Sequence, residues 1–271
     1  HLLDAEALTI LEDLGCEGVV VSIDGVQETH DRGRPGPGAR RRESSHGQVL
    51  AALDLLAASP IRTSVITAVH RANLPELPAI HALLKEHGVQ GWQVQLAHAT
   101  GRARSHVREL EGRTGGLLSP AELPALVDFL VVAVADPTLP PRVHNSIGYL
   151  GRDEPLLRSA GRARGRPFWQ GCRCGLTSMA IEPDGGLKGC ASQVGEPFVV
   201  GNVREEPLQA IWDDRPRWHW LNPPPDAMGG DCAPCALKSI CAAGCTALAW
   251  ASSGALFDNP YCHRRVRALP L

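Results

Sequence analysis

The sequence has no hydrophobic run long enough to cross a membrane. Its most apolar segment, LVDFLVVAV at 126–134, falls far short of the roughly 20 residues that a spanning helix needs, and we interpret it as a core helix. The chain also has no excess of either charge, because its formal net charge is −2. That balance gives no electrostatic reason to expect nucleic acid or an anionic membrane as a partner. No signal-peptide pattern opens the chain, so we expect a cytoplasmic protein.

Helical and strand-like patterns alternate through the first half of the sequence. The β-branched run at 19–23 is typical of a parallel strand that is buried on both faces. Ser119 to Glu122 has the pattern of a capping box with proline at the first helical position. Helices that alternate with buried strands predict βα units and a parallel sheet. We expect helices at 4–15, 47–58, 74–88 and 119–135, and strands at 19–23, 62–69 and 89–96.

The composition changes after Tyr149. Eight of the nine cysteines and five of the six tryptophans lie beyond it, and the expected strands become short. We predict an α/β domain over 1–155 and a smaller, metal-stapled domain over 156–271. The tryptophans of the second domain are expected in its core. The stretch RGRPGPGARRRESS at 32–45 is expected to be a loop.

The cysteines of the second domain have a distinctive spacing. From Cys232 the pattern is CX2C, five residues, then CX3C to Cys245, with Cys262 farther on and Cys172, Cys174 and Cys190 upstream. In a cytosolic chain such an array indicates metal binding rather than disulfides. A structural zinc site usually joins two knuckles across a longer loop, and five residues barely allow this. Eight thiols suit two 4Fe-4S clusters, so the spacing favours iron–sulfur while zinc stays open.

This array resembles the SPASM domain, the auxiliary-cluster domain that follows the barrel of many radical SAM enzymes. The segments GLTSMAIEPDGGLKGC and VGNVREEPLQAIW are similar to its hairpin and following helix, and VVVSIDGVQETHD resembles the third strand and loop of the radical SAM partial barrel. The resemblance therefore implies an α/β fold, an incomplete radical SAM partial (β/α) barrel followed by a small Cys-rich SPASM domain.

The resemblance also implies which thiols act together. A distal auxiliary 4Fe-4S cluster would take one set of thiols and a proximal cluster another, so that the CX3C motif is divided between them. Cys174 is an additional thiol that either completes the proximal set or packs as a small hydrophobe, and Cys16 is expected to pack in the core. The distal set is Cys232, Cys235, Cys241 and Cys262, and the proximal set is Cys172, Cys174, Cys190 and Cys245.

The motif that starts radical SAM chemistry is missing. The sequence contains no CX3CX2C, whose three thiolates hold a third 4Fe-4S cluster with an open iron for S-adenosylmethionine. The first residue is His1 rather than Met, and HLLDAEA resembles the segment just after the second barrel strand. We therefore expect that the chain is a truncated piece, that S-adenosylmethionine and the third cluster bind only to the full-length protein, and that this chain alone is inactive.

Polar residues are expected at the carboxyl ends of the strands, where barrels of this kind gather their functional groups. Ser22 and Asp24 follow the first strand, and Gln95 ends another. His30, Asp31 and Arg34 are expected on the loop after the first strand. The resemblance implies that Ser22, Asp24, Arg34 and Gln95 bind the cofactor, whereas the alternative for each is a strand-end cap or a solvated loop residue.

The resulting hypothesis is a fragment of a radical SAM/SPASM enzyme that modifies a peptide or protein, as in the maturation of ribosomal peptides. A 5′-deoxyadenosyl radical would act on the substrate, with an electron donor such as flavodoxin or ferredoxin as a partner. Two alternatives come from other classes. One is a non-catalytic iron–sulfur electron-transfer or binding protein, and the other is a zinc-stapled adaptor.

Overall fold

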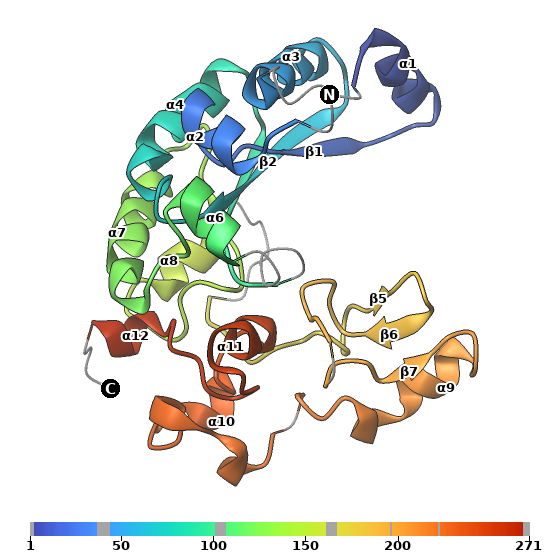
Figure 1. Cartoon of the computed structure of the whole chain (residues 1–271), viewed down its shortest axis with the longest axis vertical. Coiled ribbons are helices and arrows are strands. Elements are labelled where there is room, and N and C mark those ends of the chain that lie inside the picture. Colours follow the sequence, from blue (N-terminus) through green and yellow to red (C-terminus); the bar gives the residue numbers. More distant parts are fainter. Residues whose placement is uncertain are drawn as a thin grey trace. The chain divides into compact units, whose positions relative to one another are not determined.

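The structure is a computed structural model, and it describes residues 3–36, 44–100, 107–160, 167–195, 197–221 and 223–267. The chain divides into two compact units (Figure 1). The first comprises His1–Ala97, His106–Gly148 and Arg152–Pro167, and the second comprises His98–Ser105, Tyr149–Gly151 and Phe168–Leu271. No helix within the described ranges is both long and apolar enough to cross a bilayer.

The first unit is built on a four-stranded parallel sheet in the order β1-β2-β3-β4, as the alternating pattern predicts. Helices α3, α4 and α7 line one side of this sheet (Figure 1). The strands are β1 Gly18–Ser22, β2 Arg62–Val69, β3 Gly91–Leu96 and β4 Arg142–Val143. The helices are α1 Ala5–Asp13, α2 Gln27–Gly33, α3 Ser45–Ala57, α4 Leu77–Glu86, α6 Val107–Thr114, α7 Leu123–Ala133 and α8 Glu154–Ser159, with short 3-10 turns η2 Leu74–Glu76 and η3 Pro120–Glu122.

Trp92 of β3 joins the sheet to the helices that cover it. Its ring stacks on His81 of α4 at 5.1 Å and meets Phe129 of α7 edge-on at 6.1 Å, and its exposed fraction is 0%. Its indole N–H donates to the Thr67 hydroxyl at 2.9 Å, and that hydroxyl donates to the carbonyl of Ile23 at 2.7 Å. Large buried side chains therefore pack the helix-covered face of the sheet. Polar side chains such as Ser22 lie on the opposite face.

The opposite face of the sheet is only partly covered. Strand β2 alternates strictly, with Val65, Thr67 and Val69 buried and the residues between them half-buried. Ser22 of β1 lies in register with Ile66 of β2, which places it on the half-buried face.

Strand β1 departs from its predicted burial. We expect a strand that is buried on both faces, but β1 pairs only with β2 among the described residues, and Val20 is 58% exposed. The expectation of double burial is therefore wrong for β1, since none of its residues is fully buried. Among the described residues, β1 is the edge strand of the sheet, and its other edge has no strand partner.

The second unit is small and rich in turns. Its three-stranded antiparallel sheet has the order β5-β6-β7, with β5 at Ala180–Ile181, β6 at Gly186–Lys188 and β7 at Gly201–Asn202. As predicted, its tryptophans form the core, where Trp169, Trp218 and Trp220 are buried. The helices are α9 Leu208–Asp213, α10 Lys238–Cys241, α11 Thr246–Ser253 and α12 His263–Val266, with 3-10 turns η4 Arg215–Arg217, η5 Pro225–Ala227 and η6 Gly230–Cys232.

Candidate functional site

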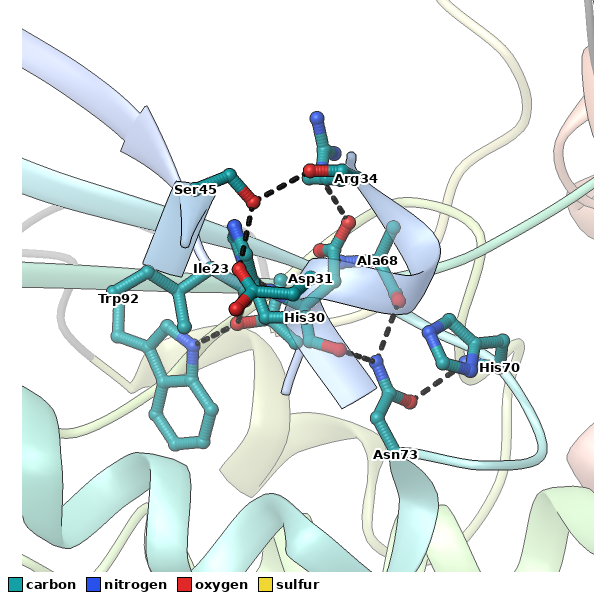
Figure 2. A network of polar contacts seen from close by, with 11 residues as sticks. Ile23, His30, Asp31, Arg34, Ser45, Ala68, His70, Asn73 and Trp92 are labelled. Carbon is teal, nitrogen blue, oxygen red and sulfur yellow. Dashed lines mark hydrogen bonds and ion pairs between the residues drawn. The ribbon is translucent and has the colours of Figure 1, made fainter. Parts of the chain in front are cut away.

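The predicted cofactor residue Asp24 is held by protein partners at the end of β1. Its side chain is 9% exposed, and its carboxylate accepts a hydrogen bond from the backbone N–H of Ala68 at 2.7 Å. The second carboxylate oxygen forms an ion pair with Arg34, which reaches back from the end of α2 (Figure 2). Both oxygens of Asp24 are therefore engaged, whereas the Arg34 side chain remains 46% exposed.

The segment that carries His30 and Asp31 is a helix, so the prediction of a loop is wrong for these two residues. They lie in α2, and Arg34 caps its end. The helix forms because tertiary contacts hold it: Asp31 accepts hydrogen bonds from the Ser45 hydroxyl at 2.9 Å and the backbone N–H of His46 at 2.8 Å, both at the start of α3. Residues 37–43 of the predicted loop lie outside the described residues.

Asn73 joins the ends of β1 and β2, and the sequence gives no sign of this role. Its side-chain amide is fully buried and donates to the carbonyls of Asp24 at 2.9 Å and Ala68 at 3.0 Å. Its amide oxygen accepts from the backbone N–H of His70 at 2.8 Å (Figure 2). Nearby, Glu76 accepts from the backbone N–H of Val26 at 3.0 Å. These contacts fix the edge at which Ser22 and Asp24 end their strand.

Three histidines near the ends of β1 and β2, namely His30, His46 and His70, have lowered pKa values and are neutral at pH 7. Burial lowers the pKa of His30 to about 4, against the opposing effect of Asp24, and its Nδ1 accepts the backbone N–H of Asp24 at 3.1 Å. Burial likewise lowers the pKa of His46 and of His70. At neutral pH Arg34 therefore supplies positive charge here without competition from protonated histidines.

Gln95 lies on the same sheet face as Ser22. It is half-buried on β3 in register with Ala68, and its amide oxygen accepts from the Gln93 amide at 3.4 Å. Gln93 is in register with Ile66, which in turn is in register with Ser22. Ser22, Gln93 and Gln95 thus form a polar surface across the strand ends, two of them residues that the sequence predicts.

The distal thiol set lines a cavity in the second unit. Cys232, Cys235, Cys241 and Cys262 all contribute to its wall, and Cys245 does not. The cavity measures about 130 Å³, several times the roughly 10–15 Å³ that one water needs. Burial, followed by the charges of its neighbours in the set, raises the pKa of the Cys241 thiol above its usual range.

The proximal thiol set is assembled from three separate segments. The Cys174 thiol interacts with both Cys172 and Cys190, which raises the pKa of Cys174 and lowers the pKa of the other two. Burial, together with the nearby thiols of Cys172 and Cys190, raises the pKa of Cys245 to about 12. Polar groups also reach these sulfurs: the Thr246 hydroxyl donates to Cys172 at 3.5 Å and the backbone N–H of Ser192 to Cys190 at 3.4 Å.

The geometry differs from that of a single-ion site. Within the described ranges, no three side chains of His, Cys, Asp or Glu are arranged to hold one metal ion. A tetrahedral zinc site brings its thiolates to about 3.8 Å from one another, whereas a cubane binds each thiolate to a different iron and needs more room. The all-sulfur donor sets and the distal cavity fit a cluster better than an ion. Cys16, which belongs to the first unit, is half-buried and donates to the Gly18 carbonyl at 3.5 Å.

Comparisons with known proteins bear on the fold and on the cysteine-rich segment. Residues 172–236 match the SPASM family model, an iron–sulfur cluster-binding domain. Solved structures align over nearly the entire chain: S-adenosylmethionine-bound SuiB of Streptococcus suis has a TM-score of 0.62 at 15% identity, and AdoMet-bound anSMEcpe has 0.66 at 16%. The chain has the radical SAM/SPASM fold.

The coverage of these similarities is unequal. The chain aligns over 97% and 98% of its own length, but it spans 58% of the SuiB chain and 69% of anSMEcpe. The AdoMet-dependent heme synthase of Methanosarcina barkeri is 28% identical over 269 residues, which is 96% of this chain and 71% of that protein. SuiB has also been solved with its precursor peptide SuiA, at a TM-score of 0.59 and 14% identity.

Proposed function

We propose that this chain is the auxiliary-cluster part of a radical SAM enzyme and that it binds two 4Fe-4S clusters. The observation that carries the proposal is the division of CX3C: Cys241 lines the distal cavity, whereas Cys245 is near Cys172 and Cys190. Cys174 acts as the fourth proximal ligand, because its thiol already contacts two members of that set. The distal ligands are Cys232, Cys235, Cys241 and Cys262, and the proximal ligands are Cys172, Cys174, Cys190 and Cys245.

In this proposal, the CX3CX2C motif of the full-length enzyme lies in a segment that packs beside the exposed edge of β1. Two unpartnered surfaces support this. Val20 is 58% exposed on the edge strand, and helix α1 buries none of its residues; Ile10 within it is 52% exposed, and Leu14, which caps it, is 77% exposed. Such surfaces are costly to leave in water. Without the segment, the chain alone does not cleave S-adenosylmethionine.

Residues at the strand ends hold S-adenosylmethionine in the full-length protein. The Ser22 hydroxyl and the Gln95 amide offer hydrogen bonds from the half-buried sheet face, and Arg34 offers a cation. Asp24 acts through Arg34, since both of its carboxylate oxygens have protein partners. When bound, S-adenosylmethionine and the third cluster supply a 5′-deoxyadenosyl radical that removes hydrogen from a substrate carbon.

The substrate is a peptide or protein in our first proposal. The likeness to SuiB, which has been solved with a precursor peptide, supports this class at the level of fold. A second candidate is a haem precursor, favoured by the greater sequence identity to the heme synthase, 28% against 14% for SuiB with its peptide. Titration of the full-length enzyme with a porphyrin, followed by absorbance, separates the two. Tight porphyrin binding would contradict the peptide proposal.

An electron carrier such as flavodoxin or ferredoxin is the proposed redox partner, in the cytoplasm. Lys238, Arg264 and Arg265 line the distal cavity with Asp231, which pairs with Arg265 at 2.5 Å. Two cations are thus left in excess at the cavity wall, which suits an acidic protein. The electron carrier would deliver electrons to the clusters.

Anaerobic reconstitution tests the proposal against its alternatives. Two cubanes correspond to about eight irons and eight sulfides for each chain. One or two zinc ions without sulfide would support a zinc-stapled adaptor and contradict the cluster assignment. The coding sequence upstream of His1 separates an enzyme from an electron-transfer protein, because only the enzyme needs an in-frame CX3CX2C.

A further inference from the structure

The three residues between Cys241 and Cys245 form an uncommon turn. Ala242, Ala243 and Gly244 all have left-handed backbone angles, with φ of 47°, 57° and 74°. For alanine this conformation costs on the order of 1 kcal/mol each, so a run of this kind persists only where its surroundings enforce it. The turn ends α10 and precedes α11, and it sends the two cysteines of CX3C into different thiol sets.

Hydrogen bonds from three side chains hold the backbone around this turn. The Trp169 indole N–H donates to the carbonyl of Cys241 at 2.8 Å. The Asn259 amide donates to the carbonyl of Ala243 at 3.0 Å, and Asn259 itself is 1% exposed. The Tyr149 hydroxyl accepts the backbone N–H of Cys245 at 3.2 Å. Cys241, Ala243 and Cys245 therefore each have a side-chain partner from another part of the second unit.

Tyr149 contacts both sides of the divide. Its ring lines the distal cavity, while its hydroxyl binds the backbone of the proximal ligand Cys245. The ring also packs on Gly244 so closely that a Cβ there would lie 2.6–2.8 Å from three of its atoms. Trp169 meets the ring edge-on at 5.4 Å. The ring is 1% exposed, so it has little room to move away.

The backbone at Tyr149 is itself constrained. Tyr149 has a φ of 80° and Leu150 a φ of 54°, a region that bulky side chains rarely occupy. Strain of this kind is retained where a side chain must be aimed at a particular place. Here the strained segment places the Tyr149 ring between the distal and the proximal thiol sets, where it forms a wall of the distal cavity.

We propose that Tyr149 is a positioning residue that keeps Cys245 in the proximal set and out of the distal set. This inference rests on the proposed function. The ring of Tyr149 closes the distal cavity to a fifth thiol, and its hydroxyl holds the Cys245 backbone beside Cys172 and Cys190. Without this wall, Cys245 is free to join Cys232, Cys235 and Cys241. The result is a four-thiol site of the kind that zinc prefers.

Two substitutions separate the ring from the hydroxyl. Tyr149→Phe keeps the wall and removes only the hydrogen bond to Cys245, while Tyr149→Ala removes both. Phe198→Leu is the matched control, since Phe198 is a fully buried aromatic of the same core that contacts Trp220 and Trp250 rather than the turn. The full chain of each variant is reconstituted anaerobically with iron, sulfide and equimolar zinc. Iron, sulfide and zinc are then counted, and the reduced clusters are examined by EPR.

We expect the wild type and Phe198→Leu to hold about eight irons and no zinc. Tyr149→Phe should retain the distal cluster and lose part of the proximal signal. Tyr149→Ala should fall to about half the iron or less and gain about one zinc. Adding Cys245→Ser to Tyr149→Ala should abolish that zinc, because the proposal makes Cys245 its fourth ligand.

Wild-type iron without zinc in both Tyr149→Phe and Tyr149→Ala would overturn the inference, as would zinc that persists after Cys245→Ser. These results leave the proposed function intact, because the clusters are still present. A wild-type chain that takes up no iron and no sulfide overturns the proposed function and the inference together. If Tyr149→Ala does not fold, the EPR signals of Tyr149→Phe decide, and an unchanged proximal signal contradicts the role of the hydroxyl.

Discussion

Arg34 pairs with Asp24 across the helix α2, so that the end of β1 and the end of α2 are tied together. The pair joins a nearly buried carboxylate to a guanidinium that is half in solvent, and the same carboxylate accepts the N–H of Ala68. The hydrogen bond to the Ala68 N–H is part-buried, whereas the ion pair with the half-exposed Arg34 is more strongly screened by water. The two contacts of Asp24 should therefore differ in their contribution to stability.

Asp24→Ala is expected to lower the free energy of unfolding by about 2 kcal/mol, because it leaves the N–H of the half-buried Ala68 without its acceptor. Asp24→Asn keeps an oxygen for that N–H and should cost about 1 kcal/mol or less. Arg34→Ala, which removes only the partly solvated cation, should cost under about 1 kcal/mol. Urea unfolding of the three variants measures the series, and an equal loss in all three would contradict this division.

Stability should fall in mild acid because of His30. Burial holds its folded pKa at about 4, whereas a histidine in the unfolded chain has a pKa near 6.5. As the pH falls below about 6.5, the His30 ring binds a proton in the unfolded state but not in the folded state. Stability is therefore lost between about pH 6.5 and about pH 4. The charged and titratable groups that face His30 are Asp24, His46, Arg34 and Asp31.

His30→Gln removes this titration and keeps a side chain able to accept the N–H of Asp24. Between pH 7.5 and pH 5 it should lose about 2 kcal/mol less stability than the wild type does. Urea unfolding at the two pH values measures the difference. His219→Gln is the control, because His219 is exposed, and it should show the wild-type loss. A pH dependence unchanged by His30→Gln would show that the ring takes up a proton as readily in the folded protein as in the unfolded chain, and would contradict the lowered pKa.

The ion pair of Glu154 and Arg158 is the most buried in the first unit among those described. The side chains are 1% and 5% exposed, their N···O distance is 2.5 Å, and Arg158 also donates to the carbonyl of Ile147 at 3.1 Å. Glu154→Leu or Arg158→Met alone should cost about 3–5 kcal/mol, since each leaves a buried charge unpaired. The double variant should recover at least about 2 kcal/mol of that loss. A double-mutant cycle by urea unfolding checks this, and additive losses would contradict it.

The unpaired edge at β1 should make this chain self-associate. Val20→Lys places a charge on the exposed face of the edge strand and is expected to lower aggregation severalfold, as followed by light scattering at rising concentration. Val132→Lys is the matched control: Val132 is 75% exposed but lies on helix α7. Equal effects of the two substitutions would point to general hydrophobicity rather than to the strand edge.

Local patterns predicted the regular elements of the first unit well. The strand at 62–69 was predicted with its observed bounds, and Ser119 and Glu122 form the expected capping box, with the Glu122 carboxylate accepting the Ser119 N–H at 2.7 Å. Helix α2 was missed because its stability comes from distant partners. Thr29 donates to Glu76 at 2.6 Å, and no apolar periodicity within the helix reports that contact.

The division of the thiols could not be predicted from spacing alone. Cys245 is four residues from Cys241 and far in sequence from Cys262, so spacing favours it as the fourth partner of the first three cysteines. The resemblance to SPASM domains implied the division instead. Its physical basis is a left-handed turn that contains two alanines, and alanine gives no sequence signal for that conformation.

Tyr149–Gly151 belong to the second unit, although the residues before and after them in the sequence belong to the first. A gene fragment cut at residue 155 or 156 would therefore leave out the ring that lines the distal cavity and the acceptor of the Cys245 N–H. Such a fragment contains every cysteine of both sets, yet it should assemble them poorly. A fragment of this unit for separate study should therefore begin at or before Tyr149.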